Sequence, residues 1–124
     1  MGHMITKNFS VNEMTCKCGC GGFIFNAALI VVLEDVRRHF GKSVTISSST
    51  RCTKHNSNVG GKPVTASSTG SKHLSGQAAD INVKDVDPSK VYDYLNSCNY
   101  SDIIGLGSYS TFTHVDTRGS RARW

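Results

Sequence analysis

The clearest hydrophobic pattern in the chain predicts a helix. Asn26 is a suitable N-cap and Gly41 can end the helix in a left-handed turn. Between them, apolar residues recur at steps of three and four and give the helix one apolar face: Leu29, Val32, Leu33, Val36 and Phe40. His39 lies in the last turn, where a cation suits the helix dipole, so we interpret it as a capping charge and not as a metal ligand.

A second helix is predicted later in the chain. Asp87 is a typical N-cap, and Pro88 suits the first helical position because its missing N–H has no partner there. The residues that follow place a second apolar face at helical spacing: Val91, Tyr94, Leu95 and Cys98.

Alternation of apolar and polar residues predicts four strands. Residues 44–48 alternate before the second helix, and so do residues 79–83, where Asp80 faces away from the buried side. Two further strands are predicted over residues 102–106 and 109–117, the latter being the last element of the chain.

Two segments show neither the helical spacing nor the strand alternation of apolar residues. We interpret residues 5–25 as an irregular N-terminal arm that docks onto the core through Phe9, Phe23 and Phe25. Residues 49–70 are polar and too long for a simple connection, and such loops in compact domains are usually functional. The whole pattern is typical of an α+β fold, with a small, mostly antiparallel sheet and two main helices packed against it.

Length and composition fit one soluble domain. The chain has 124 residues, of which 38% are hydrophobic and 19% charged. Residues 1–4, Met-Gly-His-Met, resemble a cloning scar, so we assign residues 5–124 to a single domain and expect a monomer. No apolar run is long enough for a membrane span, and no signal peptide is visible before Ile5, although an export signal could have been removed.

The charge balance favours partners of negative potential. The formal net charge is +5 and the pI is about 9.1, which suits nucleic acid, anionic lipid surfaces or an anionic cell-wall polymer. The basic residues are scattered, apart from the tail at 118–124, and aromatic residues are not interleaved with them. Nucleic acid is therefore the weaker option, and we expect no nucleic-acid partner.

Five cysteines are many for a chain of this size. Cys16, Cys18 and Cys20 form a tight array, and Cys52 and Cys98 stand alone. The odd count argues against a fully paired disulfide framework. Structural zinc sites usually have two to four residues between paired cysteines, whereas this array has one. A structural metal held by the array with Cys52 or Cys98, reduced cysteines and a single disulfide all stay open.

The stretch SKHLSGQAADI, residues 71–81, holds the best candidates for chemistry. His73 and Asp80 supply an imidazole nitrogen and a carboxylate oxygen, two ligand types of open catalytic zinc sites, and His114 is the best third ligand. Such a site leaves a position for water. In an extended strand Asp116 shares a face with His114, and it could accept a proton or orient His114. The alternative is that these are ordinary surface or core residues.

These residues resemble a known family. SKHLSGQAADI matches the S-x-H-x-x-G-x-A-x-D motif of the zinc D-alanyl-D-alanine carboxypeptidase family, and THVDTR is similar to its later histidine motif. The segment SSSTRCTKHNSNVGG resembles the family's S-G-Y-R-C-x-x-x-N-x-x-V-G-G. The resemblance runs from about Phe9 to Arg118. It implies the fold that this family shares with lysostaphin-type enzymes and the hedgehog signalling domain.

The resemblance also implies roles for single residues. It makes His73, Asp80 and His114 the ligands of one catalytic zinc ion. It makes Arg51 the group that binds a substrate carboxylate, which suits the bidentate geometry of a guanidinium. Ser71 would lie at the edge of the site and donate a hydrogen bond to the substrate.

One departure from the family concerns the general base. Many members have an acidic residue three positions before the last zinc histidine, where this chain has Thr111, and Phe112 stands two positions before it. A subgroup with H-V-D resembles this sequence better. Asp116 is then the candidate for the catalytic base or for the partner of His114, and His55 on the polar loop is the alternative.

The function implied by the resemblance is that of a peptidoglycan peptidase. It would cleave the stem peptide or cross-bridge beside a D-amino acid, as a D,D-carboxypeptidase or an L,D- or D,D-endopeptidase. The short chain resembles a phage endolysin, and an exported wall-remodelling enzyme whose signal was removed is the competing origin. A second hypothesis is a non-catalytic zinc-binding module of the same fold that binds the cell wall or a partner, which Thr111 keeps open.

Overall fold

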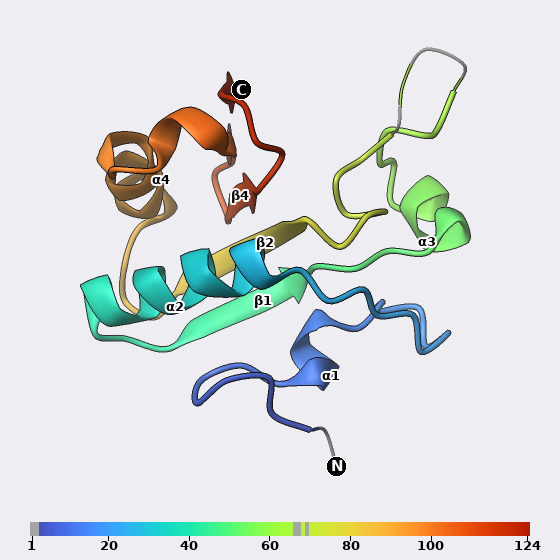
Figure 1. The fold of residues 1–124 in the computed structure, drawn as a ribbon, viewed down its shortest axis with the longest axis horizontal. Helices are drawn as coiled ribbons and strands as arrows, with labels where there is room; N and C mark the ends of the chain where they lie inside the picture. Colours follow the sequence, from blue (N-terminus) through green and yellow to red (C-terminus); the bar gives the residue numbers. More distant parts are fainter. Residues whose placement is uncertain (1–2, 66–67, 69) are drawn as a thin grey trace.

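The computed structural model of the protein describes residues 3–65, 68 and 70–124 (Figure 1). Its centre is a five-stranded sheet in the order β1-β2-β4-β3-β5. Neighbouring strands run antiparallel, except that β5 runs parallel to β3. The strands are β1 (Val44–Ser48), β2 (Ala78–Val83), β3 (Gly105–Ser108), β4 (Thr113–Asp116) and β5 (Ala122–Arg123). The predicted α+β class with a mostly antiparallel sheet is confirmed.

The two main helices form where the hydrophobic pattern predicts them. Helix α2 spans Ala27–Phe40, capped by the Asn26 side chain and ended by Gly41 at a φ of 64°. Helix α4 spans Pro88–Ser97, and the Asp87 carboxylate accepts from the amide of Ser89. Three short elements complete the fold: α1 (Val11–Met14), α3 (Thr53–Asn58) and the 3-10 turn η1 (Ser101–Ile103).

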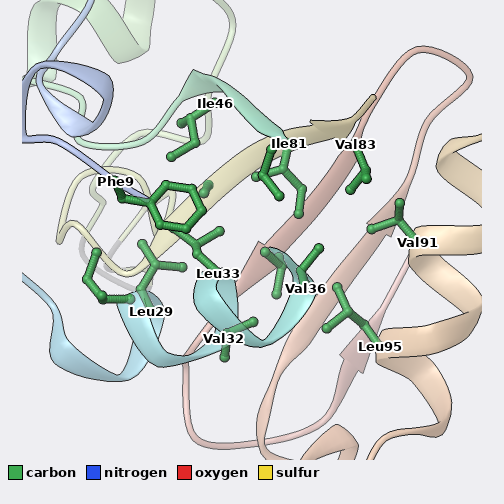
Figure 2. Packing of buried hydrophobic residues seen from close by; sticks show 14 of the residues in the cluster. Phe9, Leu29, Val32, Leu33, Val36, Ile46, Ile81, Val83, Val91 and Leu95 are labelled. Carbon is green, nitrogen blue, oxygen red and sulfur yellow. The ribbon is translucent and has the colours of Figure 1, made fainter. Parts of the chain in front are cut away.

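The core lies between these helices and one face of the sheet. Leu29, Leu33 and Val36 of α2 point toward Ile46 and Ile81 of the sheet (Figure 2). Val91 and Leu95 of α4 extend the same cluster, and Phe9 closes it from the N-terminal arm (Figure 2). Because side chains alternate along a strand, the polar residues between these apolar positions face the opposite side of the sheet. The helices therefore leave that second face for the functional residues.

Several predicted elements differ from those in the structure. The strand predicted over residues 102–106 is replaced by η1 followed by β3, and the strand over 109–117 shortens to β4 and is not the last. The polar segment 49–70 contains α3, which has no apolar stripe to reveal it, and its residues 66, 67 and 69 lie outside the described part. Phe25 is 58% exposed and is not part of the core cluster, whereas Phe9 is buried in it.

Residues 1 and 2 of the expected cloning scar also lie outside the described ranges. Among the helices that the structure does describe, none has the length and apolar character to cross a membrane.

Candidate metal centre

The register of β2 against β4 brings two of the three predicted ligands together. Asp80 pairs directly with His114, so their side chains project side by side from the face away from the helices. His73, just before β2, reaches the same point. Asp80 Oδ1 lies 2.9 Å from His114 Nδ1 and 3.2 Å from His73 Nε2. All three residues are buried, with exposed fractions of 2% for His73, 7% for Asp80 and 8% for His114.

A tight turn directs His73 into the site. The Ser71 hydroxyl accepts a hydrogen bond from the His73 amide at 3.2 Å, and the turn ends at Gly76 with a φ of +72°. A Cβ at Gly76 would lie 2.6 Å from the carbonyl oxygen of Ile24. A side chain there would meet both a strained backbone and a collision, so the glycine in the motif has a steric reason.

The hydrogen bonds around the histidines fix where their protons lie. His73 Nδ1 is 2.7 Å from the carbonyl oxygen of Ser49, which can only accept, so this nitrogen carries the proton. His114 Nε2 is 2.8 Å from a carboxylate oxygen of Asp116, so it too is the donor. In the neutral rings, the other two nitrogens present lone pairs to the carboxylate of Asp80.

Lone pairs that converge in a buried place repel one another unless protons or a metal ion lie between them. Their ligand atoms all lie within 4.8 Å of one another. Two nitrogen or oxygen ligands of a tetrahedral zinc ion lie about 3.3 Å apart, given bonds of about 2.0 Å, and the two closest approaches at Asp80 are similar to this value. The residues present therefore fit a zinc ion.

Asp116 lies behind His114 and is itself held firmly. It is fully buried, and Arg118 donates to it through Nε and Nη2, each at 2.8 Å. Burial would raise the pKa of Asp116, but the hydrogen bonds from Arg118 and His114 outweigh burial and hold this pKa well below its usual range. Gly105 on β3 leaves space for the pair, since a Cβ there would lie 2.6 Å from Asp116 Oδ1.

The same contacts shift the ionisation of the candidate ligands. Burial would raise the pKa of Asp80, but the rings of His114 and His73, which donate to Asp80 when the facing nitrogen carries a proton, hold this pKa well below its usual range, so Asp80 is a carboxylate at neutral pH. Burial would lower the pKa of His114, but Asp116 and Asp80 raise it above its ordinary value. A metal ion that binds Nδ1 must therefore displace protons from the metal-free site.

Arg51 contacts the second carboxylate oxygen of Asp80. Its Nη2 lies 3.4 Å from Asp80 Oδ2, its Nε donates to the hydroxyl of Ser48, and its Nη1 donates to Oδ1 of Asn56 at 3.2 Å. Asn56 is buried on α3 and also donates to the carbonyl of Lys62. A Cβ at Gly61 would lie 2.0 Å from that amide oxygen, so the Val-Gly-Gly of the motif makes room for the Arg51 support.

A pocket of about 600 Å³ opens above these residues. The charged residues of its wall are mostly cationic, with Arg51, Lys62, Lys72 and Arg118 beside the one carboxylate among its described residues, that of Asp80. The remaining walls include Ser71 and an aromatic group: Tyr109, Phe112 and Trp124. Tyr109 stacks on Phe112 at 4.4 Å between ring centroids, and the Trp124 indole donates to the Tyr109 hydroxyl.

The structure brings together most of the residues that the sequence singles out. His73, Asp80, His114, Arg51 and Ser71 all line this pocket. Asp116 lies directly behind it, in contact with His114. Thr111 is exposed, and neither it nor His55 is among the described residues of the pocket wall.

Several supporting residues carried no role in the sequence interpretation. Asn56 and Arg118 stand inside the quoted motifs, and that was the only signal for them. Ser49 contacts His73 through its backbone carbonyl, which every residue type has, so its side chain gives no signal. Trp124 reaches the site from the end of the chain, outside the quoted motifs. Its ring lies 5.0 Å from that of His114.

Four of the five cysteines form a second cluster. The sulfur atoms of Cys16, Cys18, Cys20 and Cys52 lie within 4.8 Å of one another. Cys98 is not part of this cluster, and its thiol donates to the carbonyl of Leu95. Of the two partners expected for the array, the structure places Cys52 next to it.

The sequence profile of the family Peptidase M15 matches residues 7–116. The chain belongs to the Peptidase M15 family. The predicted family is thereby confirmed, and the match covers Arg51 together with the three candidate ligands. M15 peptidases are zinc-dependent, in agreement with the buried His-Asp-His group of this member. No curated protein matches the chain.

Replacing a ligand should remove one metal ion from the folded protein. We expect His73→Ala and His114→Ala each to lose one zinc ion per chain relative to the wild type, because two ligands hold zinc far less tightly than three. Metal analysis of the purified protein after dialysis measures this. His39→Ala is the matched control, because this histidine stacks on Tyr94 of α4 and is not one of the candidate ligands. Full zinc content in either ligand variant would refute the ligand set.

Proposed function

We propose that this M15 peptidase is a peptidoglycan hydrolase that uses zinc to cleave a peptide bond beside a D-amino acid. The observation that carries the proposal is the convergence of His73 Nε2, His114 Nδ1 and an Asp80 oxygen at the wall of a cationic pocket. A metal held there would have protein ligands on one side and the open pocket on the other. Zinc in such a position supplies a Lewis acid that polarises a carbonyl and activates water.

The residues around the ligands hold the histidine rings in the orientation that binds metal. The Ser49 carbonyl and the Asp116 carboxylate each hold the proton of the distal ring nitrogen, which turns the lone pair of the other nitrogen toward the pocket. Of the two roles considered for Asp116, we assign it that of a positioning residue. Both of its oxygens accept hydrogen bonds from Arg118, and the residue is fully buried. It therefore has no free lone pair that could accept a proton from a group in the pocket.

Arg51 supports recognition of a carboxylate at the substrate's end. It lines the pocket beside Asp80, and its guanidinium is held by Ser48 and Asn56 in one orientation. Lys62 and Lys72 add positive charge to the same wall. Ser71 lies at the pocket edge, and its hydroxyl hydrogen can be donated to a substrate carbonyl. These groups suit an acidic peptide, such as a stem peptide with free carboxylates.

The site of action that follows is the bacterial cell wall. A net charge of +5 favours association with an anionic wall. A phage-encoded lysis protein and an exported wall-remodelling enzyme would both act there, most simply as a monomer.

One observation favours a second candidate function. Asp80 is the one carboxylate among the described residues of the pocket wall, and the position of the family's usual acid is the exposed Thr111. A zinc-binding module that recognises wall peptides without cleaving them would have these properties.

Digestion of purified cell-wall sacculi separates the two functions. We expect the zinc-loaded protein to release new amines and to change the muropeptide pattern in mass spectrometry, which also identifies the bond cleaved. A chelator and His73→Ala should each abolish the change, whereas His39→Ala should retain it. Binding to sacculi without any new product would favour the non-catalytic module.

The role of Arg51 can be tested with matched peptide substrates. Arg51→Ala should raise the KM for a peptide with a free terminal carboxylate by roughly ten- to hundredfold, because a charge-assisted hydrogen bond is worth about 1.5–3 kcal/mol. The amidated form of the same peptide should show little change, and Arg51→Lys should be intermediate. Equal losses on both peptides would show instead that Arg51 acts through Asp80.

A further inference from the structure

The four clustered cysteines come from two distant parts of the chain. Cys16, Cys18 and Cys20 belong to the N-terminal arm, and Cys52 directly follows Arg51. Cys18 lies 3.5 Å from Cys16 and 3.7 Å from Cys52, measured between sulfur atoms. Cys16 is buried, Cys52 is partly buried, and Cys18 and Cys20 are exposed. The cluster is therefore closed on the protein side and reachable from solvent on the other.

The sulfur spacing distinguishes a metal site from a disulfide. Two thiolates bound to a tetrahedral zinc ion lie about 3.8 Å apart, given Zn–S bonds of about 2.3 Å. A disulfide would join two of these sulfur atoms at about 2.05 Å. The two measured separations are close to the first value, and all four sulfur atoms share one small volume instead of forming pairs.

The backbone of the array is shaped to gather its sulfur atoms. In an extended chain, residues four positions apart are separated by about 13 Å, because each residue rises about 3.3 Å. Gly19 and Gly21 have φ values of +88° and +79°, which let the chain curl at alternate residues. The Cys16 amide closes the curl by donating to the carbonyl of Gly22 at 2.7 Å. This explains how a one-residue spacing can supply three ligands.

Backbone amides are directed at three of the four sulfur atoms. The amide of Cys52 donates to the sulfur of Cys16, that of His55 to Cys52, and that of Gly22 to Cys20, each at 3.4 Å. Such contacts stabilise negative charge on sulfur, and hydrogen bonds of this kind accompany ligands that hold a metal.

We propose that Cys16, Cys18, Cys20 and Cys52 bind one structural Zn²⁺ ion as four thiolates, separate from the His73–Asp80–His114 centre. Four sulfur ligands with tetrahedral spacing select zinc over calcium or magnesium, which take oxygen ligands. With four protein ligands the ion has no open position for substrate, so its role is to hold the chain.

The zinc ion ties the N-terminal arm to the segment that carries Arg51. The two segments lie side by side (Figure 1), joined by hydrogen bonds from the Thr50 amide to the Met14 carbonyl and from the Ile24 amide to the Thr50 hydroxyl. Apart from Phe9 and Met14, the arm contributes few apolar residues to the core. In a small domain, a metal ion that joins such an arm to the rest of the fold stabilises the folded arm.

Counting zinc in the protein of residues 1–124 tests this proposal. The wild type should contain two zinc ions per chain. The double variant Cys18→Ser/Cys20→Ser should contain one, because it lacks two of the four thiolates. Both of these side chains are exposed, so the substitutions leave the core untouched. Cys98→Ser, the control outside the cluster, should keep two. His73→Ala should keep one zinc, and combining His73→Ala with the cysteine pair should leave none. A wild type with a single zinc ion that His73→Ala removes would overturn the proposal, as would iron in place of the second zinc.

A cobalt-substituted protein gives a readout that needs no cysteine variant. Four thiolates around Co²⁺ should produce intense thiolate-to-cobalt charge-transfer absorption, and this absorption should persist in His73→Ala. Its absence from wild-type protein loaded with two cobalt ions would overturn the proposal. So would an intact mass lower by two hydrogens per bond in non-reduced protein, since that result identifies disulfides. Neither outcome depends on whether the protein cleaves peptidoglycan.

Discussion

The cross-strand pairing of Asp80 with His114 is the contact on which the candidate centre depends. Antiparallel register places these two side chains opposite each other on β2 and β4, on the face that the helices leave uncovered. A slip of β2 by one residue would turn Asp80 into the apolar core and bring Ile81 into the site, and a slip of β4 would do the same with His114 and Val115. The apolar residues that alternate with Asp80 and His114 therefore set the geometry of the candidate centre as firmly as these two residues themselves.

The surroundings of this pair arrange a polar cluster so that it could hold a metal ion. Ser49 and Asp116 fix the protons of the two histidines, and Arg118 keeps Asp116 ionised in a fully buried place. Small residues provide the room: Gly105 lies against the Asp116 carboxylate, and Gly107 lies against the Trp124 ring. Burial of a carboxylate costs folding free energy unless the carboxylate is paired. This network of paired groups therefore also stabilises the fold.

The fold class and the candidate ligands could be predicted from local patterns because each has a local cause. Helix α2 begins and ends at its predicted caps because Asn26 and Gly41 act within one turn. Two of the three candidate ligands can be singled out from the sequence because a motif of ten residues carries both His73 and Asp80. The α3 helix could not be predicted, since its six polar residues have no periodic signal and its one buried side chain, Asn56, serves Arg51. Likewise, the choice of Cys52 over Cys98 depends on long-range folding.

Anomalous diffraction at the zinc absorption edge, from crystals of the zinc-loaded protein, tests the central claim most directly. The account predicts a peak about 2.0–2.2 Å from His73 Nε2, His114 Nδ1 and an Asp80 oxygen, facing the pocket lined by Arg51. A zinc ion bound through the other histidine nitrogens, or no peak between these three residues in protein that contains zinc, would contradict it.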